Sequence, residues 1–466
     1  MKTRAKIAAF FRRKKPLSRG ERGVAMLIVL TWLALMISLI SEFTYGTTVD
    51  AAQAANARDE LRAHYLARSG VNLSRLLIKI QQKFVDPSMA QAKQMLSTLM
   101  GPQSGTGGSS GSSAASNPLA GISLRVTDYA GPLMGFFSGS KDDVASLGGL
   151  IGIDTEGIKG LGLKEGGFDA EITAEDGKID VACGSGVTPD RNRQMQVYRL
   201  LMGRMYSRRF DRLFSEADQS GQFTTRPDVA RAIIDWADAD DQMFSPEGAS
   251  AAEDYKYDAR ADKYRAHDNT YDSIEELKLV RGVSDGFMEA FAPHLTVYAS
   301  DQNCLVNLGA ISNKNGGDCT PLLMGVIRAA ATPDPQKPPT DPSILDDSRL
   351  YPIASLACDR ASAAGFDSLS TITNLMKNPQ GAVLPDDPRY KIFQSLPPIN
   401  ISDGDLAKVA KVESPRVYRV VATGTFGRVK KKITAIVDSR GILNYPLTLN
   451  TAAEQAAGVL RYWREE

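Results

Sequence analysis

Residues 24–41 read VAMLIVLTWLALMISLIS and contain no charged side chain. A helix of these eighteen residues would rise about 27 Å, at about 1.5 Å per residue, which matches the hydrocarbon core of a bilayer. Residues 1–23 carry nine Lys or Arg against a single acid, Glu21. Because positively charged flanks stay in the cytoplasm, the pattern predicts a membrane-spanning helix with the rest of the chain outside the cytoplasm.

Three interpretations of this apolar segment are open. A cleaved secretory signal would need small residues close behind it, and the nearest candidate, Ala52-Gln53-Ala54, lies more than ten residues further on. A plain membrane anchor explains the apolar run and the charges. However, the helical pattern continues without a proline until Pro87, with apolar residues at Leu61, Tyr65, Leu66, Leu73, Leu76, Leu77 and Ile80. We therefore predict one continuous helix over 24–85, apolar in its first half and amphipathic in its second.

A basic leader that ends at Gly23, followed by such a helix, resembles the class III signal of type IV pilins and type II secretion pseudopilins. The resemblance implies that a prepilin peptidase removes residues 1–23 and that the new first residue, Val24, is N-methylated. Most pilins carry Glu at the fifth mature position, where this chain has Ile28. A carboxylate in a bilayer is costly unless a neighbour pairs with it, so its absence suits a subunit at a filament tip. Within the family this absence is typical of the K-type minor pseudopilin.

The composition describes an ordinary globular protein of two or three domains, with 466 residues, 43% hydrophobic residues and a net charge of +1. The four cysteines, Cys183, Cys304, Cys319 and Cys358, show no C-x-x-C spacing. Outside the cytoplasm an even number of cysteines favours disulfides. Cys304 with Cys319 is the most local pairing and would leave Cys183 with Cys358, but three connectivities are possible and the sequence does not choose among them.

Residues 86–187 give few signs of regular structure. The Gly/Ser-rich segment 101–118 has the composition of a flexible coil and predicts a disordered insertion. Short strands are predicted at Ile122–Val126, Phe168–Ile172 and Lys178–Val181, the last after a turn at Gly177.

Residues 188–295 read instead as an all-helical domain. Helices are predicted at Arg191–Phe214, Pro227–Ala237, Ile274–Val280 and Asp285–Phe291, with Ser273 and Glu276 as a capping box at the start of the third. The last two helices flank a glycine turn, which is the outline of a helix-hairpin-helix. The alternative function is therefore a membrane-tethered nucleic-acid-binding protein. Residues 227–276 contain fourteen acids and five bases, which argues against phosphate binding and predicts no nucleic-acid partner.

The same acids lie in a long loop after the helix that ends near Ala237. Carboxylates at alternate positions are typical of calcium ligands, and a solvated acidic loop is the alternative interpretation. The loop is not an EF-hand, because Met243 and Ala249 occupy the positions of its invariant glycine and bidentate glutamate.

A series of landmarks is similar to the general secretion pathway protein K family: Trp-x-Asp-x-Asp from 236, Ala-Glu-Asp-x-x-Tyr from 252, SIEELKLVRGV at 273–283, PHLTV at 293–297 and Val306-Asn307. The resemblance implies a pilin-like α/β domain into which the all-helical domain is inserted. It also implies structural calcium held by the acidic loops, and the corresponding candidate ligands are Asp238, Asp240, Asp241, Glu253 and Asp254. The region 87–170 is longer than its counterpart in the family.

The pilin-like domain is expected to resume over residues 296–466. The pattern predicts a strand at Leu295–Tyr298, helices at Pro321–Ala331 and Ser368–Met376, a proline-rich loop at 332–343 and a β-hairpin of Arg416–Thr425 with Val429–Val437. Residues 459–465 are similar to the family's tail. The predicted fold class is α+β, with a long N-terminal helix, a small antiparallel sheet and a helix-hairpin-helix-like (SAM-like) all-α insertion.

No catalytic motif accompanies the three histidines, His64, His267 and His294, and only His267 lies among the carboxylates. The sequence therefore predicts a structural protein and not an enzyme. The family resemblance implies a minor pseudopilin of type II protein secretion that caps the tip of the periplasmic pseudopilus, helps to initiate its assembly and limits its length. Its expected partners are the I- and J-type minor pseudopilins, the major pseudopilin, the prepilin peptidase and inner-membrane lipid. Its expected location is the bacterial inner membrane, with a periplasmic head.

Overall fold

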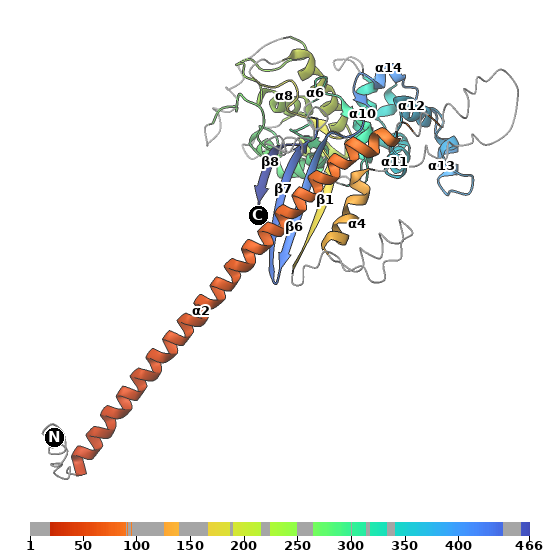
Figure 1. Cartoon of the computed structure of the whole chain (residues 1–466). Coiled ribbons are helices and arrows are strands. Elements are labelled where there is room, and N and C mark those ends of the chain that lie inside the picture. The colour runs from red at the N-terminus through yellow and green to blue at the C-terminus, as the bar shows by residue number, and fades with distance from the viewer. Residues whose placement is uncertain are drawn as a thin grey trace, which may run out of the picture.

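The computed structural model shows a long helical stem that ends in a head of mixed α and β structure (Figure 1). The described residues are 19–89, 91, 95, 125–138, 166–186, 190–215, 224–248, 264–299, 301–313, 317–332, 341–440 and 458–466. The predicted insertion 101–118 lies outside these residues. Helices and an antiparallel sheet occur together in one head, so the predicted α+β class is confirmed.

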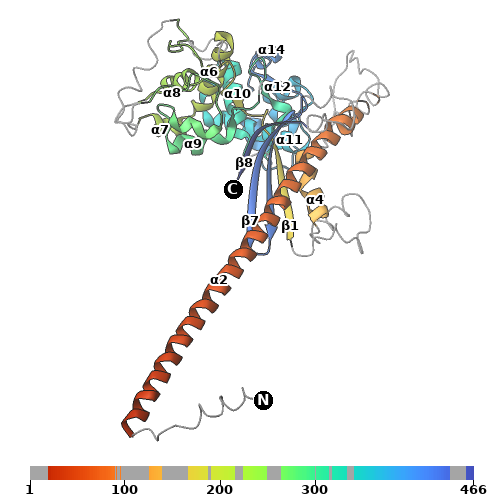
Figure 2. The same ribbon diagram turned by 60° about the vertical axis from the view of Figure 1, so that its left-hand side comes forward.

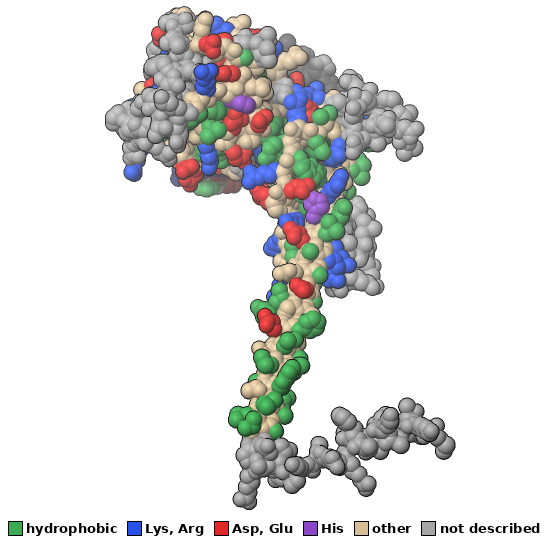
Figure 3. All heavy atoms as spheres, turned by 90° about the vertical axis from the view of Figure 1, so that its left-hand side faces the viewer, with side chains coloured by type: hydrophobic (Ala, Val, Ile, Leu, Met, Phe, Trp, Pro, Cys, Tyr) green, Lys and Arg blue, Asp and Glu red, His purple; other side chains and the backbone are tan. Residues whose placement is uncertain are grey.

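The stem is helix α2 (Arg19–Ile80), which continues as a π-helical turn, η1 (Gln81–Val85). Its first half is coated with exposed apolar side chains, such as Trp32 and Phe43 with exposed fractions of 60% and 71% (Figure 3). One segment of the stem is long and apolar enough to cross a membrane, and no part of that segment is buried by the head. The prediction of one continuous helix, apolar in its first half, is confirmed. The predicted apolar face of its second half is not the buried one, because Leu61, Tyr65, Leu76 and Ile80 are exposed; the face that packs on the head contains Ala63, Ala67, Val71, Leu77 and Ile78.

Four antiparallel strands form the main sheet in the order β1-β6-β7-β8. Their bounds are β1 (Gly166–Ala174), β6 (Val417–Phe426), β7 (Val429–Asp438) and β8 (Val459–Glu465). Val, Ile, Tyr and Thr fill β6 and β7, and Gly427, at φ 59°, allows the tight turn between them. The predicted hairpin and the predicted strand Phe168–Ile172 are confirmed. The family-like tail, 459–465, is the edge strand β8.

Helix α2 crosses β6 at very short range. A Cβ added at Gly424 of β6 would lie 2.0 Å from the carbonyl oxygen of Ala63 and 2.4 Å from the amide nitrogen of Ala67. Only glycine permits so close an approach of two backbones. Helix α4 (Val126–Ser138) packs on β1 beside α2, and its fully buried Met134 joins the core between α2 and the sheet (Figure 1).

The helical part of the head lies between β1 and β6 in sequence. Its longer helices are α6 (Arg191–Met205), α8 (Arg226–Asp235), α10 (Thr320–Ala331), α11 (Asp347–Ala363) and α12 (Leu369–Lys377). Its shorter helices are η2 (Arg208–Phe210), α7 (Asp211–Ser215), η4 (Ile274–Leu279), α9 (Asp285–Phe291), η5 (Ala292–His294), η6 (Leu308–Ala310), η7 (Pro342–Leu345), η8 (Pro379–Ala382), α13 (Tyr390–Ser395) and α14 (Asp403–Leu406). Two parallel pairs of short strands join β2 (Ile179–Asp180) to β3 (Leu295–Thr296), and β4 (Val306–Asn307) to β5 (Ala410–Lys411).

Helix α10 is the centre of this helical part, because almost all of its side chains are buried. It packs against α6 where two glycines meet: a Cβ on Gly203 would lie 2.4 Å from the carbonyl oxygen of Gly325. The predicted helices over Pro227–Ala237, Pro321–Ala331 and Ser368–Met376 are confirmed within two residues as α8, α10 and α12.

The predicted helix Arg191–Phe214 is wrong in its continuity: α6 ends at Met205, and the chain becomes helical again at η2 and α7 after a break at Tyr206 and Ser207. The Arg226 guanidinium donates from Nε to the Met205 carbonyl oxygen at 2.8 Å, and so supplies a partner that a longer helix would have supplied from its own backbone. The predicted strand Ile122–Val126 falls mostly outside the described residues, and its last residue, Val126, begins α4.

The predicted capping box of Ser273 and Glu276 is also wrong. The Ser273 side chain makes no cap hydrogen bond, and Glu276 Oε2 accepts from the backbone amide of Asp272 at 2.9 Å. A capping box does occur at the start of α8, between Thr225 and Asp228. Helix α11, which the sequence did not predict, contains Pro352, a residue that normally argues against a helix interior.

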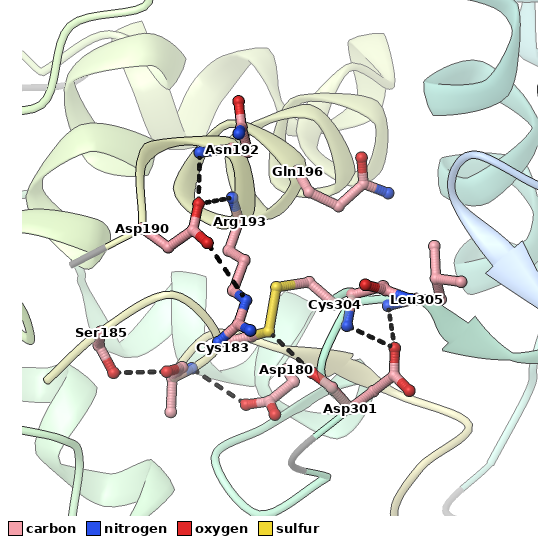
Figure 4. The surroundings of a disulfide bond; sticks show 12 residues. Asp180, Cys183, Ser185, Asp190, Asn192, Arg193, Gln196, Asp301, Cys304 and Leu305 are labelled. Atoms are coloured by element: carbon pink, nitrogen blue, oxygen red, sulfur yellow. Dashed lines mark hydrogen bonds and ion pairs between the residues drawn. A yellow bond between two sulfur atoms is a disulfide. The ribbon is translucent and has the colours of Figure 1, made fainter. Parts of the chain in front are cut away.

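The four cysteines form two disulfides, Cys183–Cys304 and Cys319–Cys358. The most local pairing, Cys304 with Cys319, is not formed. The parallel pairing of β2 with β3 brings the turn with Cys183 beside the segment with Cys304, where the Asp301 carboxylate accepts from the Leu305 amide at 3.0 Å (Figure 4). The other disulfide joins the residue before α10 to the middle of α11.

Gly424→Ala is expected to lower the free energy of unfolding by about 3 kcal/mol, because the added methyl overlaps the backbone of α2. The matched control is Gly131→Ala, since a Cβ at Gly131 would meet nothing within 4 Å. Urea denaturation of the detergent-solubilised chain, followed by tryptophan fluorescence, measures both. Equal stabilities of the two variants would contradict the close approach of α2 to β6.

Replacing Cys183 and Cys304 by Ser is expected to lower the stability by about 5 kcal/mol, and replacing Cys319 and Cys358 by about 4 kcal/mol. The difference arises because the sequence separations are 121 and 39, and a longer closed loop restricts the unfolded chain more. The same denaturation assay applies, and non-reducing peptide mapping identifies the linked peptides. Recovery of a peptide that links Cys304 to Cys319 would overturn the observed connectivity.

Candidate functional site

The end of helix α8 fixes the start of the acidic loop. Trp236 is buried, and its indole Nε1 donates to Glu276 Oε1 at 2.8 Å. The buried Asp235 accepts the backbone N–H of Phe244 at 2.6 Å, which folds the loop back onto the helix. Asp238 is thereby carried into the interior of the head instead of into solvent.

Asp238 is the most unusual carboxylate of this loop, because only 1% of its surface is exposed. The amide Nε2 of Gln194, on α6, donates to its Oδ2 at 2.6 Å, while its buried Oδ1 has no hydrogen-bond partner among the described residues. Burial, together with the nearby Asp240 carboxylate, raises the pKa of Asp238 to about 7. A buried carboxylate with an unsatisfied oxygen requires a proton or a cation.

The other predicted ligands are distributed unevenly. Asp240 and Asp241 are exposed, and Asp240 Oδ1 accepts the backbone N–H of Gln242 at 2.8 Å. Glu253 and Asp254 lie outside the described residues. The structure therefore brings Asp240 within electrostatic reach of Asp238, and gives no position for the last two.

One acid that sequence reasoning did not select, Asp268, also lies close enough to raise the pKa of Asp238. Its backbone adopts a positive φ of 52°, a conformation that Asp tolerates better than most residues. The sequence placed Asp268 in the same acidic run, but thirty positions separate it from Asp238. The proximity of Asp268 to Asp238 depends on how the chain folds back after the acidic loop.

The Asp238 carboxylate fits calcium in one respect. Its buried Oδ1 is a hard oxygen ligand, and no described group donates a hydrogen bond to it. Across the described ranges, however, no group of three or more His, Cys, Asp or Glu side chains is arranged to hold a metal ion. Calcium takes six to eight oxygen ligands, so residues of the loop between 249 and 263 or backbone carbonyls would have to complete the shell.

His267, the only histidine considered as a ligand, faces a different carboxylate. Its Nδ1 lies 2.9 Å from Glu276 Oε1, the same oxygen that accepts from Trp236. Glu276 therefore joins three segments of the helical part: the end of α8, the loop with His267 and the backbone at Asp272. In these described contacts the role of Glu276 is structural.

The glycine turn between η4 and α9 faces the protein. A Cβ on Gly282, at φ 79°, would lie 2.8 Å from Val229 and 3.0 Å from the Thr224 hydroxyl. Ser284 then begins α9 by accepting the Phe287 amide on its hydroxyl at 3.1 Å. The turn thus packs the η4–α9 helical hairpin against the start of α8, where the described neighbours of Gly282 are Val229 and Thr224.

At the other end of the molecule, Gly23 and Val24 are exposed residues of α2. None of the described residues lies within 4 Å of a Cβ added at Gly23. Cleavage after Gly23 and methylation of Val24 stay predictions.

Comparisons with known proteins point to one family. The family described as type II secretion system (T2SS), protein K, matches residues 192–300. Among solved structures, the chain is similar to one from the crystal structure of the GspK-GspI-GspJ complex of the enterotoxigenic Escherichia coli type 2 secretion system. That match has 11% sequence identity and a TM-score of 0.39, and it covers 66% of this chain and 81% of that chain. No curated protein matches the sequence.

The matched residues run from α6 through β3, and they contain the acidic loop, the Glu276 contacts and the glycine turn. These are the segments whose landmarks resemble protein K in the sequence. Residues 192–300 of the chain are therefore similar to the family of type II secretion system protein K.

Proposed function

We propose that this chain is a minor pseudopilin that caps the tip of the periplasmic pseudopilus. The observation that carries the proposal is the form of α2, whose first half is apolar and exposed while one face of its second half packs on the head. Such a helix needs lipid, or the apolar faces of similar helices, around it. It can lie in the inner membrane before assembly and pack in a helical bundle afterwards.

The position of the head supports a place at the end of a filament. Figures 1 and 2 show the helical part gathered at the end of the sheet remote from the N-terminus of α2. A further subunit would have to pack its own stem above this bulk. Ile28, with an exposed fraction of 53%, offers no carboxylate to a subunit beyond, in keeping with a tip position that limits the length of the filament.

The proposed partners follow from the same stem. I- and J-type minor pseudopilins would pack against the apolar half of α2, and the solved complex to which the chain is similar contains proteins named GspI and GspJ. The major pseudopilin would continue the filament below. The prepilin peptidase and inner-membrane lipid would contact the chain before assembly, with the head in the periplasm.

A structural role accounts for buried titratable groups that would otherwise suggest chemistry. His294 accepts from Arg204 on Nδ1 at 3.2 Å and donates from Nε2 to the Asp318 carbonyl oxygen at 3.0 Å. Burial, reinforced by the Arg204 charge, lowers the pKa of His294 to about 4, so the ring stays neutral. Both ring nitrogens are occupied, which supports a protein that is not an enzyme.

We also propose that the acidic loop binds structural calcium. Asp238 would supply its unpartnered Oδ1, with Asp240, Asp241, Glu253 and Asp254 as the further candidates. The ion would supply positive charge to carboxylates that repel one another, and so order the loop around the end of α8. The family resemblance and the buried Asp238 support this proposal together.

Processing tests the proposed function at the N-terminus. In a host with a type II secretion system, membrane-extracted protein is expected to begin at N-methylated Val24, and Gly23→Val is expected to keep the leader and to stop export. Gly20→Val is the matched control, because it changes a leader glycine that is not at the cleavage site. N-terminal sequencing and assay of the exported protein measure both effects. A mature chain that begins at Met1 or near Ala55, or deletion of the chain without effect on export, would contradict the proposal.

Calcium binding predicts a cation-dependent stability. Chelation is expected to lower the melting temperature of the full chain, and calcium at a hundred times its Kd to restore about 2.7 kcal/mol. Asp238→Asn is expected to abolish this response and Asp285→Asn, at an exposed position on α9, to retain it. Thermal unfolding with and without calcium, and calorimetric titration, make the comparison. If Asp238→Asn binds calcium as the wild type does, Asp238 is not a ligand.

A further inference from the structure

A cavity lies in the helical part, away from the acidic loop. It has a volume of about 320 Å³ and lies between the end of α6, η2, α10 and α11. Three arginines contribute to its lining: Arg204, Arg209 and Arg328. Among the described residues of its lining, Asp347 supplies the only carboxylate.

Arg204 is buried with an exposed fraction of 3%. Its Nη2 donates to the Ala290 carbonyl oxygen at 2.7 Å, and the guanidinium lies over the ring of Phe291 at 4.8 Å. Its buried Nε has no hydrogen-bond partner in the part of the chain that the structure describes. Leaving an N–H group of a buried cation without an acceptor is costly in free energy.

Arg328 is buried to the same extent, with an exposed fraction of 3%, and its Nη2 lies 2.5 Å from Asp347 Oδ1. Asp347 also accepts the hydroxyl of Ser207. This ion pair neutralises one guanidinium and fixes its orientation towards the cavity wall.

Arg209 is exposed at the edge of the cavity. Its guanidinium lies over the ring of Phe210 at 4.5 Å, and no ion pair of Arg209 occurs among the described residues. Three guanidinium groups and one carboxylate leave a formal excess of two positive charges. The mutual repulsion is appreciable: burial and then the charges of Arg209 and Arg328 lower the pKa of Arg204 to about 9.

We propose that this cavity, which we name the arginine pocket, binds a small dianionic oxyanion group such as a dicarboxylate or a phosphate. Guanidinium groups present N–H donors in a planar fork that suits carboxylate and phosphate oxygens. An oxyanion in the arginine pocket would accept from the exposed guanidinium of Arg209 and offset the excess positive charge of the three arginines. The other walls include Pro321, Met324 and Tyr351, which leave room for an apolar body attached to the anion.

The arginine pocket is independent of the proposed calcium site. Arg204 and Gln194 lie on α6, but Gln194 contacts Asp238 near its first turn and Arg204 belongs to its last turn. Calcium and oxyanion binding can therefore fail separately, and neither depends on the position of the chain in a filament.

Calorimetric titration of the full mature chain in a neutral detergent tests the proposal, with succinate, inorganic phosphate and acetate as probes. Sodium chloride of equal ionic strength is the reference, because exposed charges respond to salt alone. Succinate or phosphate is expected to bind and to raise the melting temperature, whereas acetate binds more weakly. Preference for succinate identifies a carboxylate ligand, and preference for phosphate a phosphate ligand.

Arg209→Gln and Arg209→Glu are expected to weaken the binding of the preferred dianion by about tenfold or more. Arg208→Gln and Arg208→Glu are the matched controls, since Arg208 is exposed on the same short helix and does not line the pocket. Both residues are on the surface, and circular dichroism checks that the variants fold. Binding no stronger than that of chloride in the wild type, or equal binding by the Arg208 and Arg209 variants, would overturn the proposal.

Discussion

The backbones of α2 and β6 approach within a distance that only glycine allows, and the attachment of the head to its stem depends on this contact. Gly424 faces Ala63 and Ala67, and a Cβ on Gly70 of the helix would lie 3.1 Å from that of Ala422. Small residues on both sides let the helix lie flat on the sheet, where larger ones would hold it away. A stem held this firmly can transmit its position in a membrane or in a bundle directly to the head.

The helical part depends on the sheet in a different way. It is inserted between β1 and β6, strands that pair directly although they lie far apart in sequence. Its own rigidity comes from the contact between Gly203 and Gly325, and from disulfides that tie β2 to the segment after β3, and α10 to α11. The periplasm, where disulfides persist, is the compartment in which such links stabilise a fold.

Helix α6 connects the two charged sites that we propose. Near its N-terminus Gln194 holds the buried carboxylate of Asp238, and in its last turn Arg204 belongs to the arginine pocket. The helix dipole favours negative charge at the first end and positive charge at the second, so both groups are placed where the backbone partly stabilises them. Among the described residues, the first site contains an unsatisfied buried oxygen, Asp238 Oδ1, and the lining of the second includes three arginines and one carboxylate, Asp347. These features are the physical basis for expecting a cation at one site and an anion at the other.

The sequence by itself determined the elements that local pattern specifies. The apolar and then amphipathic helix of the stem, the hairpin β6–β7 and helices such as α8 and α10 follow from periodicity and turn residues, and the family landmarks follow from short motifs. Tertiary structure alone decided which cysteines pair, which amide Glu276 accepts from, that α11 tolerates Pro352, and that Asp268 and three arginines converge on their sites. The physical reason is that these features depend on contacts between segments distant in sequence, and the relative placement of such segments leaves no periodic trace in the residues themselves.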